Sequence, residues 1–273
     1  MAGALLGLAW AALGHAEEPC AQWLRRVPAI TREQCTQLGL QPSGTRSVQG
    51  RMLWVRDVVA PDPTLRVLVL GAIHGDEASS ATVALHWLAL ALAQPENTHW
   101  RFIPVLNPDG LLRNGGARRT NAHGVDLNRN FPTPGWHEQA RNYWIKTTNK
   151  DPRRYPGPMP LSEPESRFVV EQLREFKPDV VVSVHAPFGV LDFDGAIPAP
   201  TQLGRLHLYP LGVYPGSLGH YGGVNNNMPV VTVELPQALK APPPGEILNM
   251  WKDLRLWLDR TVVAQKKPTD AVR

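Results

Sequence analysis

The sequence predicts an α/β fold, with a single domain built on a mostly parallel mixed sheet that is flanked by helices. Three short apolar runs rich in β-branched residues, at positions 67–70, 180–184 and 230–233, have the composition of strands buried on both faces. Residues 81–93 are a longer apolar segment, and residues 246–263 carry apolar side chains at helical spacing. Buried strands that alternate with helical segments are typical of parallel sheets.

The length and composition fit one large globular domain. The chain has 273 residues, of which 43% are hydrophobic and 19% charged, and its mean hydropathy is −0.23. A chain of this size can bury a full core. The net charge of +4 comes from scattered lysines and arginines. The composition therefore does not favour binding to nucleic acid.

The first 16 residues differ from the rest of the chain. Residues 2–13 are uncharged and nearly all apolar, and the small residues Gly14 and Ala16 match a signal-peptidase site. The apolar run of about 12 residues is shorter than the roughly 20 that a membrane span needs. We therefore expect a signal peptide that is cleaved after Ala16, and export to the periplasm. The segment departs from the usual signal-peptide pattern in one respect, because no lysine or arginine follows Met1. The alternative interpretation is a buried N-terminal helix.

The two cysteines of the chain, Cys20 and Cys35, lie just after this segment. In an oxidising compartment they are expected to form a disulfide. A loop of about 15 residues closed in this way contributes roughly 3 kcal/mol in the chain-entropy model. The alternative is two unrelated buried thiols.

Local signals predict the elements of the first half. Residues 20–40 are expected to form short helices, with Thr31 as an N-cap and Gln34 closing a capping box. Residues 42–44 break this segment. Strands are expected at 51–59, 66–70 and 100–106, and a helix at 77–94. Residues 107–134 are rich in Gly, Asn, Arg and Pro, and a loop of this length is usually functional.

The second half is predicted in the same way. Residues 139–160 are polar and punctuated by prolines, so we expect a surface excursion. Ser162 is expected to cap a helix that runs to about Phe176, with Pro164 in its first turn and Glu165 closing a capping box. Residues 188–193 are a candidate strand, and residues 201–220 are expected to be irregular.

Side chains that can bind a metal follow the buried strands. His74 and Glu77 come directly after the first strand, His185 ends the second, and Glu234 ends the third. Ligands of open α/β sheets bind beyond the carboxyl ends of the strands, so these side chains are expected to meet. Two histidines and one carboxylate leave a fourth tetrahedral position open, as in catalytic zinc sites. Glu234, beside an apolar core, is then placed to act as a general base.

Six segments together resemble the M14-type zinc carboxypeptidases, and among them most closely the murein peptide amidases. The segments are residues 74–77 (HGDE), 107–110 (NPDG), 124–132 (GVDLNRNFP), 162–165 (SEPE), 183–185 (SVH) and 232–236 (TVELP). The resemblance implies a zinc carboxypeptidase-like fold with one Zn²⁺ per chain. His74, Glu77 and His185 match the zinc ligands, and Glu234 matches the carboxylate that activates water and then protonates the leaving amine.

The resemblance also implies how the substrate is held. Arg119 matches the arginine that stabilises the oxyanion. Asn128 and Arg129 match the pair that binds the terminal carboxylate, for which a guanidinium is well suited. Carboxypeptidases of the digestive type also carry a mobile tyrosine before the catalytic glutamate, and Tyr221 is the nearest candidate here.

The likeness to the amidases implies hydrolysis of the γ-D-glutamyl–meso-diaminopimelate bond in peptides derived from peptidoglycan. Asp192 and Asp194 are candidates to meet the cationic amine of diaminopimelate, and the alternative is two solvated loop charges. Three other functions compete with this one. They are a general zinc carboxypeptidase acting on L-peptides, a deacylase of the succinylglutamate desuccinylase type, and a catalytically inactive module that binds the cell wall.

The predicted organisation has four parts. A signal peptide (1–16) precedes a preface that carries the cysteine pair (17–45). The zinc carboxypeptidase-like catalytic domain covers residues 46–264, and a flexible tail covers residues 265–273.

Overall fold

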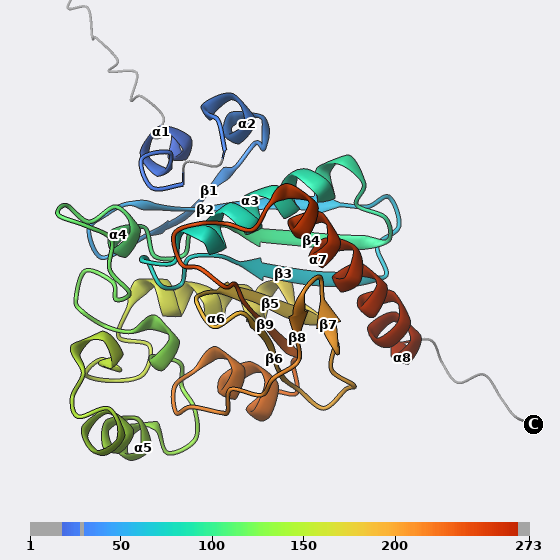
Figure 1. Cartoon of the computed structure of the whole chain (residues 1–273). Helices are drawn as coiled ribbons and strands as arrows, with labels where there is room; N and C mark the ends of the chain where they lie inside the picture. The colour runs from blue at the N-terminus through green and yellow to red at the C-terminus, as the bar shows by residue number, and fades with distance from the viewer. Residues whose placement is uncertain (1–17, 28–29, 267–273) are drawn as a thin grey trace, which may run out of the picture.

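A computed structural model of the chain describes residues 18–27 and 30–266 (Figure 1). The predicted signal peptide lies outside the described residues, and so do residues 267–273 of the predicted tail. Among the described residues, no helix combines the length and the hydropathy that crossing a membrane requires.

A seven-stranded mixed sheet forms the centre of the protein, with the strand order β1-β2-β4-β3-β5-β9-β6. The four central strands run parallel to one another: β4 (Thr98–Ile103), β3 (Leu65–Leu70), β5 (Val180–His185) and β9 (Val230–Glu234). Antiparallel strands flank them: β1 (Gln41–Arg46) and β2 (Met52–Val59) on one side and β6 (Val190–Asp194) on the other. The predicted α/β class and mixed sheet are confirmed.

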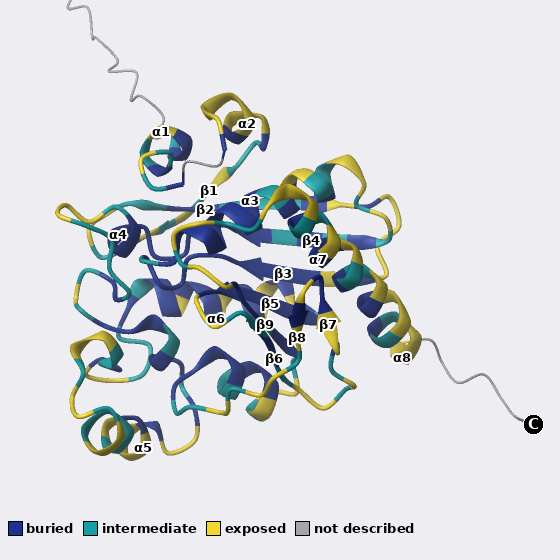
Figure 2. Ribbon diagram, in the orientation of Figure 1, coloured by how far each residue is buried: buried dark blue, intermediate teal, exposed yellow. Residues whose placement is uncertain are grey.

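Helices cover both faces of the sheet, and the central strands are buried between them (Figure 2). On one face, α3 (Ala78–Ala93) and α7 (Pro244–Trp257) share a core with alternate strand residues such as Val182. On the other face, α6 (Pro164–Phe176) packs with the intervening residues, such as Val181. Because successive strand residues point to opposite faces, two distinct cores result.

The apolar core on the α6 face ends before the strands do. On β5 the residues that follow Val181 on this face are Ser183 and His185, which lie beside Thr232 and Glu234 of β9. The carboxyl ends of β5 and β9 therefore present polar side chains where the apolar packing stops. This is the place at which the sequence predicted the functional residues.

One strand of the seven-stranded sheet was not predicted. β1 contains Pro42 and Gly44, which argue against a strand and were expected to break the chain there. Among the described residues, β1 is an edge strand that pairs only with β2. An edge strand tolerates proline because one side of its backbone makes no ladder hydrogen bonds.

The predicted surface excursion at residues 139–160 is partly helical. α5 (Trp136–Asn142) continues into a π-helical turn, η2 (Tyr143–Thr147), and a short helix, η3 (Pro152–Arg154), follows. Trp136 is buried, and its Nε1 donates to the carbonyl oxygen of Arg129 at 2.9 Å. This contact fastens α5 to the long loop of residues 107–134.

The start of α6 differs from the prediction. Its N-cap is Glu163 rather than Ser162, and the cap makes no side-chain hydrogen bond. Asn121 Nδ2 donates to Glu163 Oε2 at 2.6 Å and to Glu165 Oε2 at 3.1 Å. Glu165 therefore joins α6 to the loop instead of closing a capping box. Both glutamates therefore have structural roles.

The remaining elements are short. The loop of residues 107–134 contains only α4 (Pro108–Leu111) and η1 (Leu127–Arg129), and the predicted irregular region contains the hairpin β7 (Gln202–Leu203) and β8 (Leu206–His207) and the start of η4 (His220–Asn225). The C-terminal helix continues past α7 through η5 (Leu258–Val263) and α8 (Ala264–Lys266). Residues 265 and 266 are thus helical, and Lys266 Nζ lies 2.6 Å from Asp179 Oδ2. The expected flexible tail is wrong for these two residues.

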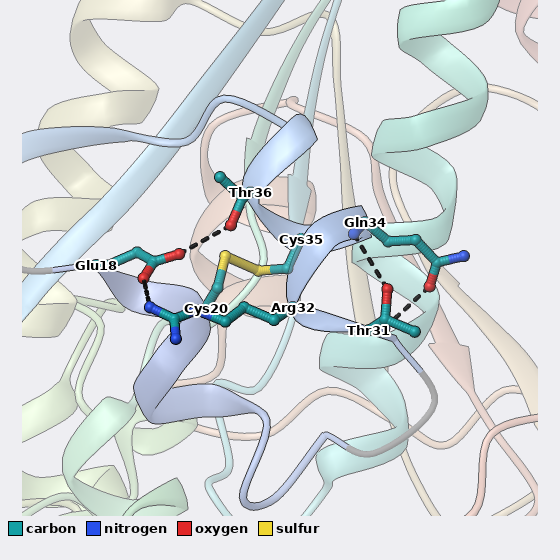
Figure 3. The surroundings of a disulfide bond; sticks show 7 residues. All are labelled: Glu18, Cys20, Thr31, Arg32, Gln34, Cys35 and Thr36. Atoms are coloured by element: carbon teal, nitrogen blue, oxygen red, sulfur yellow. Dashed lines mark hydrogen bonds and ion pairs between the residues drawn. A yellow bond between two sulfur atoms is a disulfide. The ribbon is translucent and has the colours of Figure 1, made fainter.

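A disulfide joins the two helices of the preface, α1 (Pro19–Trp23) and α2 (Arg32–Gln37) (Figure 3). The predicted bond between Cys20 and Cys35 is confirmed, and both cysteines are buried in the core on the α3 face. The predicted capping box is also present: Thr31 Oγ1 accepts from the backbone of Gln34, and the Gln34 side chain accepts from the backbone of Thr31. Glu18 links the two helices further, because it accepts hydrogen bonds from Arg32 and Thr36 (Figure 3).

Candidate metal centre

The ends of β3 and β5 bring His74, Glu77 and His185 together. One ligand atom from each lies within 4.8 Å of the others, and all three residues are buried. His74 Nδ1 is 2.8 Å from Glu77 Oε1. His185 Nδ1 is 3.2 Å from Glu77 Oε2 and 3.2 Å from His74 Nδ1. The three predicted ligands therefore meet in space.

Tight packing shapes the turn that carries His74 and Glu77. A Cβ atom on Gly75 would lie 2.2 Å from the carbonyl carbon of Gly110, so position 75 has no room for a side chain. The buried hydroxyl of Ser80 joins the two ends of the turn. It accepts from Ala72 N at 2.9 Å and donates to Glu77 O at 2.6 Å. The turn that leaves β3 is thus fixed before any ligand binds.

Each histidine is oriented through its other ring nitrogen. His74 Nε2 lies 3.2 Å from Asp126 Oδ1, and His185 Nε2 lies 2.9 Å from Ser183 Oγ. Both Nδ1 atoms therefore face the shared space. Metal-binding histidines are typically held by such a carboxylate or oxygen partner. The contact of Asp126 with His74 was not predicted.

The donor set fits a divalent cation. Two imidazole nitrogens and a carboxylate are ligands that Zn²⁺ accepts. Burial raises the pKa of the Glu77 carboxyl, but the adjacent histidines lower it more, so the net shift is downward and the group is an anion at neutral pH. Two Nδ1 atoms 3.2 Å apart need a proton or a cation between them, and a metal ion meets that need.

Glu234 stands beside this cluster. It lies in register with His185 on the neighbouring parallel strand. Its side chain is buried, and its Oε2 has no hydrogen-bond partner among the described residues. Burial raises the pKa of Glu234, and His185 opposes the shift. A carboxylate with a raised pKa and a free oxygen can accept a proton and return it.

A cavity of about 480 Å³ opens over these residues. Every predicted site residue except Tyr221 lines it, namely His74, Glu77, Arg119, Asn128, Arg129, His185, Asp192, Asp194 and Glu234. A larger hollow of about 850 Å³, with Trp144 and Tyr155 in its wall, contains none of these residues. The smaller cavity is therefore the candidate active site.

Arg119 and the metal ligand His74 share the carboxylate of Asp126. Arg119 Nε donates to Asp126 Oδ2 at 2.9 Å, and its Nη1 lies 3.6 Å from Glu77 Oε1. Asn128 N also donates to Asp126 at 3.0 Å. One buried carboxylate thus sets the positions of a ligand, a guanidinium and the start of η1.

Arg129 is a buried cation with unused hydrogen-bonding capacity. It is only 5% exposed, its guanidinium lies 4.7 Å from the centre of the Tyr214 ring, and its Nε has no partner among the described residues. Asn128 Oδ1 accepts from Leu218 N at 2.8 Å, which leaves the amide nitrogen of Asn128 to donate. Buried unpaired donors of this kind suit an anionic group of a ligand.

Asp192 and Asp194 form an acidic wall on β6, opposite β9. Asp192 Oδ1 accepts from Leu211 N at 3.2 Å. Burial raises the pKa of both carboxyls, and with the added charge of Asp192 the pKa of Asp194 rises to about 6. They are cavity-lining groups rather than solvated loop charges.

The structure does not bring Tyr221 to the cavity. Its ring stacks on Phe131 at 6.0 Å, and it lines a separate hollow together with Pro132 and Asn226. Tyr214 lines the active-site cavity instead, and its hydroxyl donates to Leu211 O at 2.6 Å. Proximity to Glu234 in the sequence singled out Tyr221, whereas the stacking of Tyr214 on Arg129 is a contact that only the fold reveals.

The fold and the candidate metal centre together define the class of protein to which the chain belongs. A model of the zinc carboxypeptidase family of peptidases matches residues 34–191, and the chain belongs to that family. It is therefore a hydrolase of the metallocarboxypeptidase type.

Individual proteins and solved structures show in more detail what the chain is similar to. Murein peptide amidase A of Escherichia coli K12 is 28% identical over 254 residues, which cover 89% of this chain and 98% of that protein. Murein peptide amidase A of Vibrio campbellii is 33% identical over 178 residues, which cover 63% of this chain and 69% of that protein. The crystal structure of the murein-tripeptide amidase from Escherichia coli O157 matches with a TM-score of 0.57 and 25% identity, over 79% of this chain and 97% of that chain. Bovine thrombin-activatable fibrinolysis inhibitor shares the fold, with a TM-score of 0.60 and 18% identity over 90% of this chain and 93% of that chain.

Proposed function

We propose that this protein is a zinc-dependent peptidase that hydrolyses the γ-D-glutamyl–meso-diaminopimelate bond of peptidoglycan peptides. The observation that carries the proposal is the distribution of charge in the cavity. Arg129, a buried cation with an unpaired Nε, lies in the same cavity as the acidic pair Asp192 and Asp194. A C-terminal diaminopimelate has a carboxylate for the first and a distal amine for the second. The names of the similar amidases support the same substrate class.

The residues of the chain divide the reaction between them. Zinc, held by His74, Glu77 and His185, would polarise the scissile carbonyl and lower the pKa of water. Arg119 would donate to the carbonyl oxygen as negative charge develops on it.

Glu234 moves the proton. Its carboxylate takes a proton from water as the water oxygen bonds to the carbonyl carbon, and it then gives that proton to the amide nitrogen as the C–N bond breaks. Asn128 and Arg129 hold the terminal carboxylate during this transfer. The products are a peptide that ends in D-glutamate and free diaminopimelate.

We further infer that the protein works outside the cytoplasm. The buried disulfide between Cys20 and Cys35 supports this, because such bonds persist in oxidising compartments. The signal-peptide pattern at residues 1–16 agrees with it. Fractionation of cells that express the full chain tests this part: recovery in the cytoplasm with both thiols reduced would contradict it.

A mass-spectrometric assay tests the reaction. The zinc-loaded protein is incubated with L-Ala-γ-D-Glu-meso-diaminopimelate, with a chelator and a Glu234→Gln variant as controls. We expect release of diaminopimelate by the parent alone. Cleavage of ordinary L-peptides in place of this tripeptide would instead identify a general carboxypeptidase.

A further inference from the structure

The cavity contains a basic group that the proposed reaction does not use. Arg153, the central residue of η3, lines the cavity beside the metal ligands. Its Nη1 lies 2.9 Å from Asp76 Oδ2, and its side chain is 58% exposed. Asp151 caps η3, because its Oδ1 accepts from Arg153 N at 2.9 Å. Arg153 is therefore a positioned cation whose other N–H groups are open to a ligand.

The partner of Arg153 ties it to the metal-ligand turn. Asp76 directly precedes Glu77, and Glu77 lies 3.6 Å from Arg119. Arg119 is the residue assigned to the scissile carbonyl. The Oδ1 atom of Asp76 is buried and has no partner among the described residues. Arg153 thus lies beside the metal-ligand turn, close to the arginine that would meet the scissile carbonyl.

The next residue, Arg154, also lines the cavity. Burial lowers the pKa of Arg129, and the positive charges of Arg119 and Arg154 lower it further. Arg154 therefore acts on the group that would bind the terminal carboxylate, whereas Arg153 pairs with Asp76.

The chemistry of a γ-linked glutamate gives Arg153 a ligand. When the amide is formed through the γ-carboxyl, the α-carboxyl stays free and anionic on the acyl side of the scissile bond. It is separated from the scissile carbonyl carbon by four carbon–carbon bonds, about 5 Å when extended. A peptide whose acyl residue has an uncharged side chain has no anion at this place.

A guanidinium can bind two carboxylates at once. It can donate to one carboxylate through Nη1 and to a second through its remaining N–H groups. Asp76 alone would repel an incoming carboxylate, and Arg153 neutralises that repulsion.

We propose that Arg153 binds the α-carboxylate of the γ-linked D-glutamyl residue and thereby favours substrates that carry a carboxylate on the acyl side over those that do not. This inference rests on the proposed function and names the determinant of its acyl-side specificity. Arg153 is a substrate-binding residue with no part in proton transfer.

A pair of peptides that differ in one group tests the inference. L-Ala-γ-D-Glu-meso-diaminopimelate carries the α-carboxylate, and the D-isoglutamine analogue carries a neutral amide of the same size. We expect the zinc-loaded parent to cleave the carboxylate peptide with a kcat/KM about tenfold higher, as one partly exposed charged hydrogen bond contributes. Arg153→Gln should abolish the preference, mainly through KM, and Arg153→Lys should restore part of it.

Two matched variants separate a specific effect from a general one. Arg154→Gln should weaken the cleavage of both peptides by the same factor. Arg174→Gln, on the exposed side of α6, should change neither. Calorimetric titration of both peptides into a Glu234→Gln background gives a second readout, in which the Arg153 substitution should weaken binding of the carboxylate peptide alone.

The outcomes distinguish the inference from the function on which it rests. Equal cleavage of the two peptides by the parent, or an equal loss on both in Arg153→Gln, would overturn the inference and leave the proposed function standing. Release of diaminopimelate from neither peptide would overturn the proposed function and the inference with it.

Discussion

The two sides of the cavity are built in opposite ways. At the metal centre, His74 and His185 each have both ring nitrogens within 3.2 Å of a partner, and Asp126 holds His74 and Arg119 at once. On the substrate side, Arg129 Nε has no partner among the described residues, and Arg153 is more than half exposed. The catalytic side is preorganised, whereas the recognition side keeps hydrogen-bonding capacity that only a ligand can satisfy.

The largest effect should come from removing the group that moves the proton. Glu234→Gln keeps the size of the side chain but cannot accept a proton, so we expect kcat to fall by roughly 10²- to 10⁴-fold while KM and zinc content stay near the parent values. Steady-state kinetics with metal analysis measure this. A variant that lost its zinc as well would show that Glu234 supports the metal site.

The preorganisation of the metal side can be weakened without touching a ligand. Asp126→Asn removes the charge that orients His74 and Arg119, and it should lower zinc affinity or activity by about 10- to 100-fold. Competition with a chelator measures the zinc affinity. Asp62→Asn, which alters an exposed carboxylate in the turn after β2, is the matched control. Unchanged affinity and activity in Asp126→Asn would contradict the role assigned to this contact.

The acidic wall predicts a pH dependence on the recognition side. The pKa of Asp194 is about 6, so its carboxylate is charged above that pH and is protonated as the pH falls through it. Between pH 7 and pH 5 the charged fraction falls about tenfold, and KM for diaminopimelate peptides should rise to match. Dividing by the KM of an analogue without the distal amine cancels the titration of other groups.

The same group has the opposite effect on folding. Its pKa is higher in the folded state than in the unfolded chain, so stability from this residue is greatest at low pH and falls as the pH rises from about 4 to about 6. Asp194→Asn should flatten both profiles. If the KM ratio of the variant stayed as steep as that of the parent, another group would have to hold the amine.

The smallest effect concerns the two tyrosines. Tyr221 lies outside the cavity, so Tyr221→Phe should change kcat/KM by less than about twofold, the range expected for a substitution away from the site. Tyr214→Ala removes the ring against Arg129 and should raise KM several-fold. The reverse order of effects would reinstate Tyr221 as the tyrosine that meets the substrate.

The sequence predicted those features that depend on strand ends. Short β-branched runs mark β3, β5 and β9, and because parallel strands end at one edge, His74, His185 and Glu234 could be placed together. Contacts between distant loops were beyond such reasoning. Asp126 reaches His74 across 52 positions, and nothing in its local pattern indicates that partner.

Irregular segments gave the weakest predictions. Arg153 lies in a polar, proline-punctuated stretch that indicates only a surface, and its place in the cavity follows from how η3 packs. β1 was missed for a related reason: Pro42 and Gly44 oppose a strand on local grounds, and only its position at the edge of the sheet makes them acceptable.

The shared register of His185 and Glu234 makes the activity of this protein a sensitive report on its folding. The spacing between ligand and base is set by the backbone hydrogen bonds that join β5 to β9, and side chains alternate between the two faces along each strand. A slip of one residue between these strands would turn Glu234 towards α3 and α7 and abolish turnover, even in a chain with an intact sheet and bound zinc. Turnover per mole of bound zinc would therefore measure the fraction of refolded molecules whose strands have paired correctly.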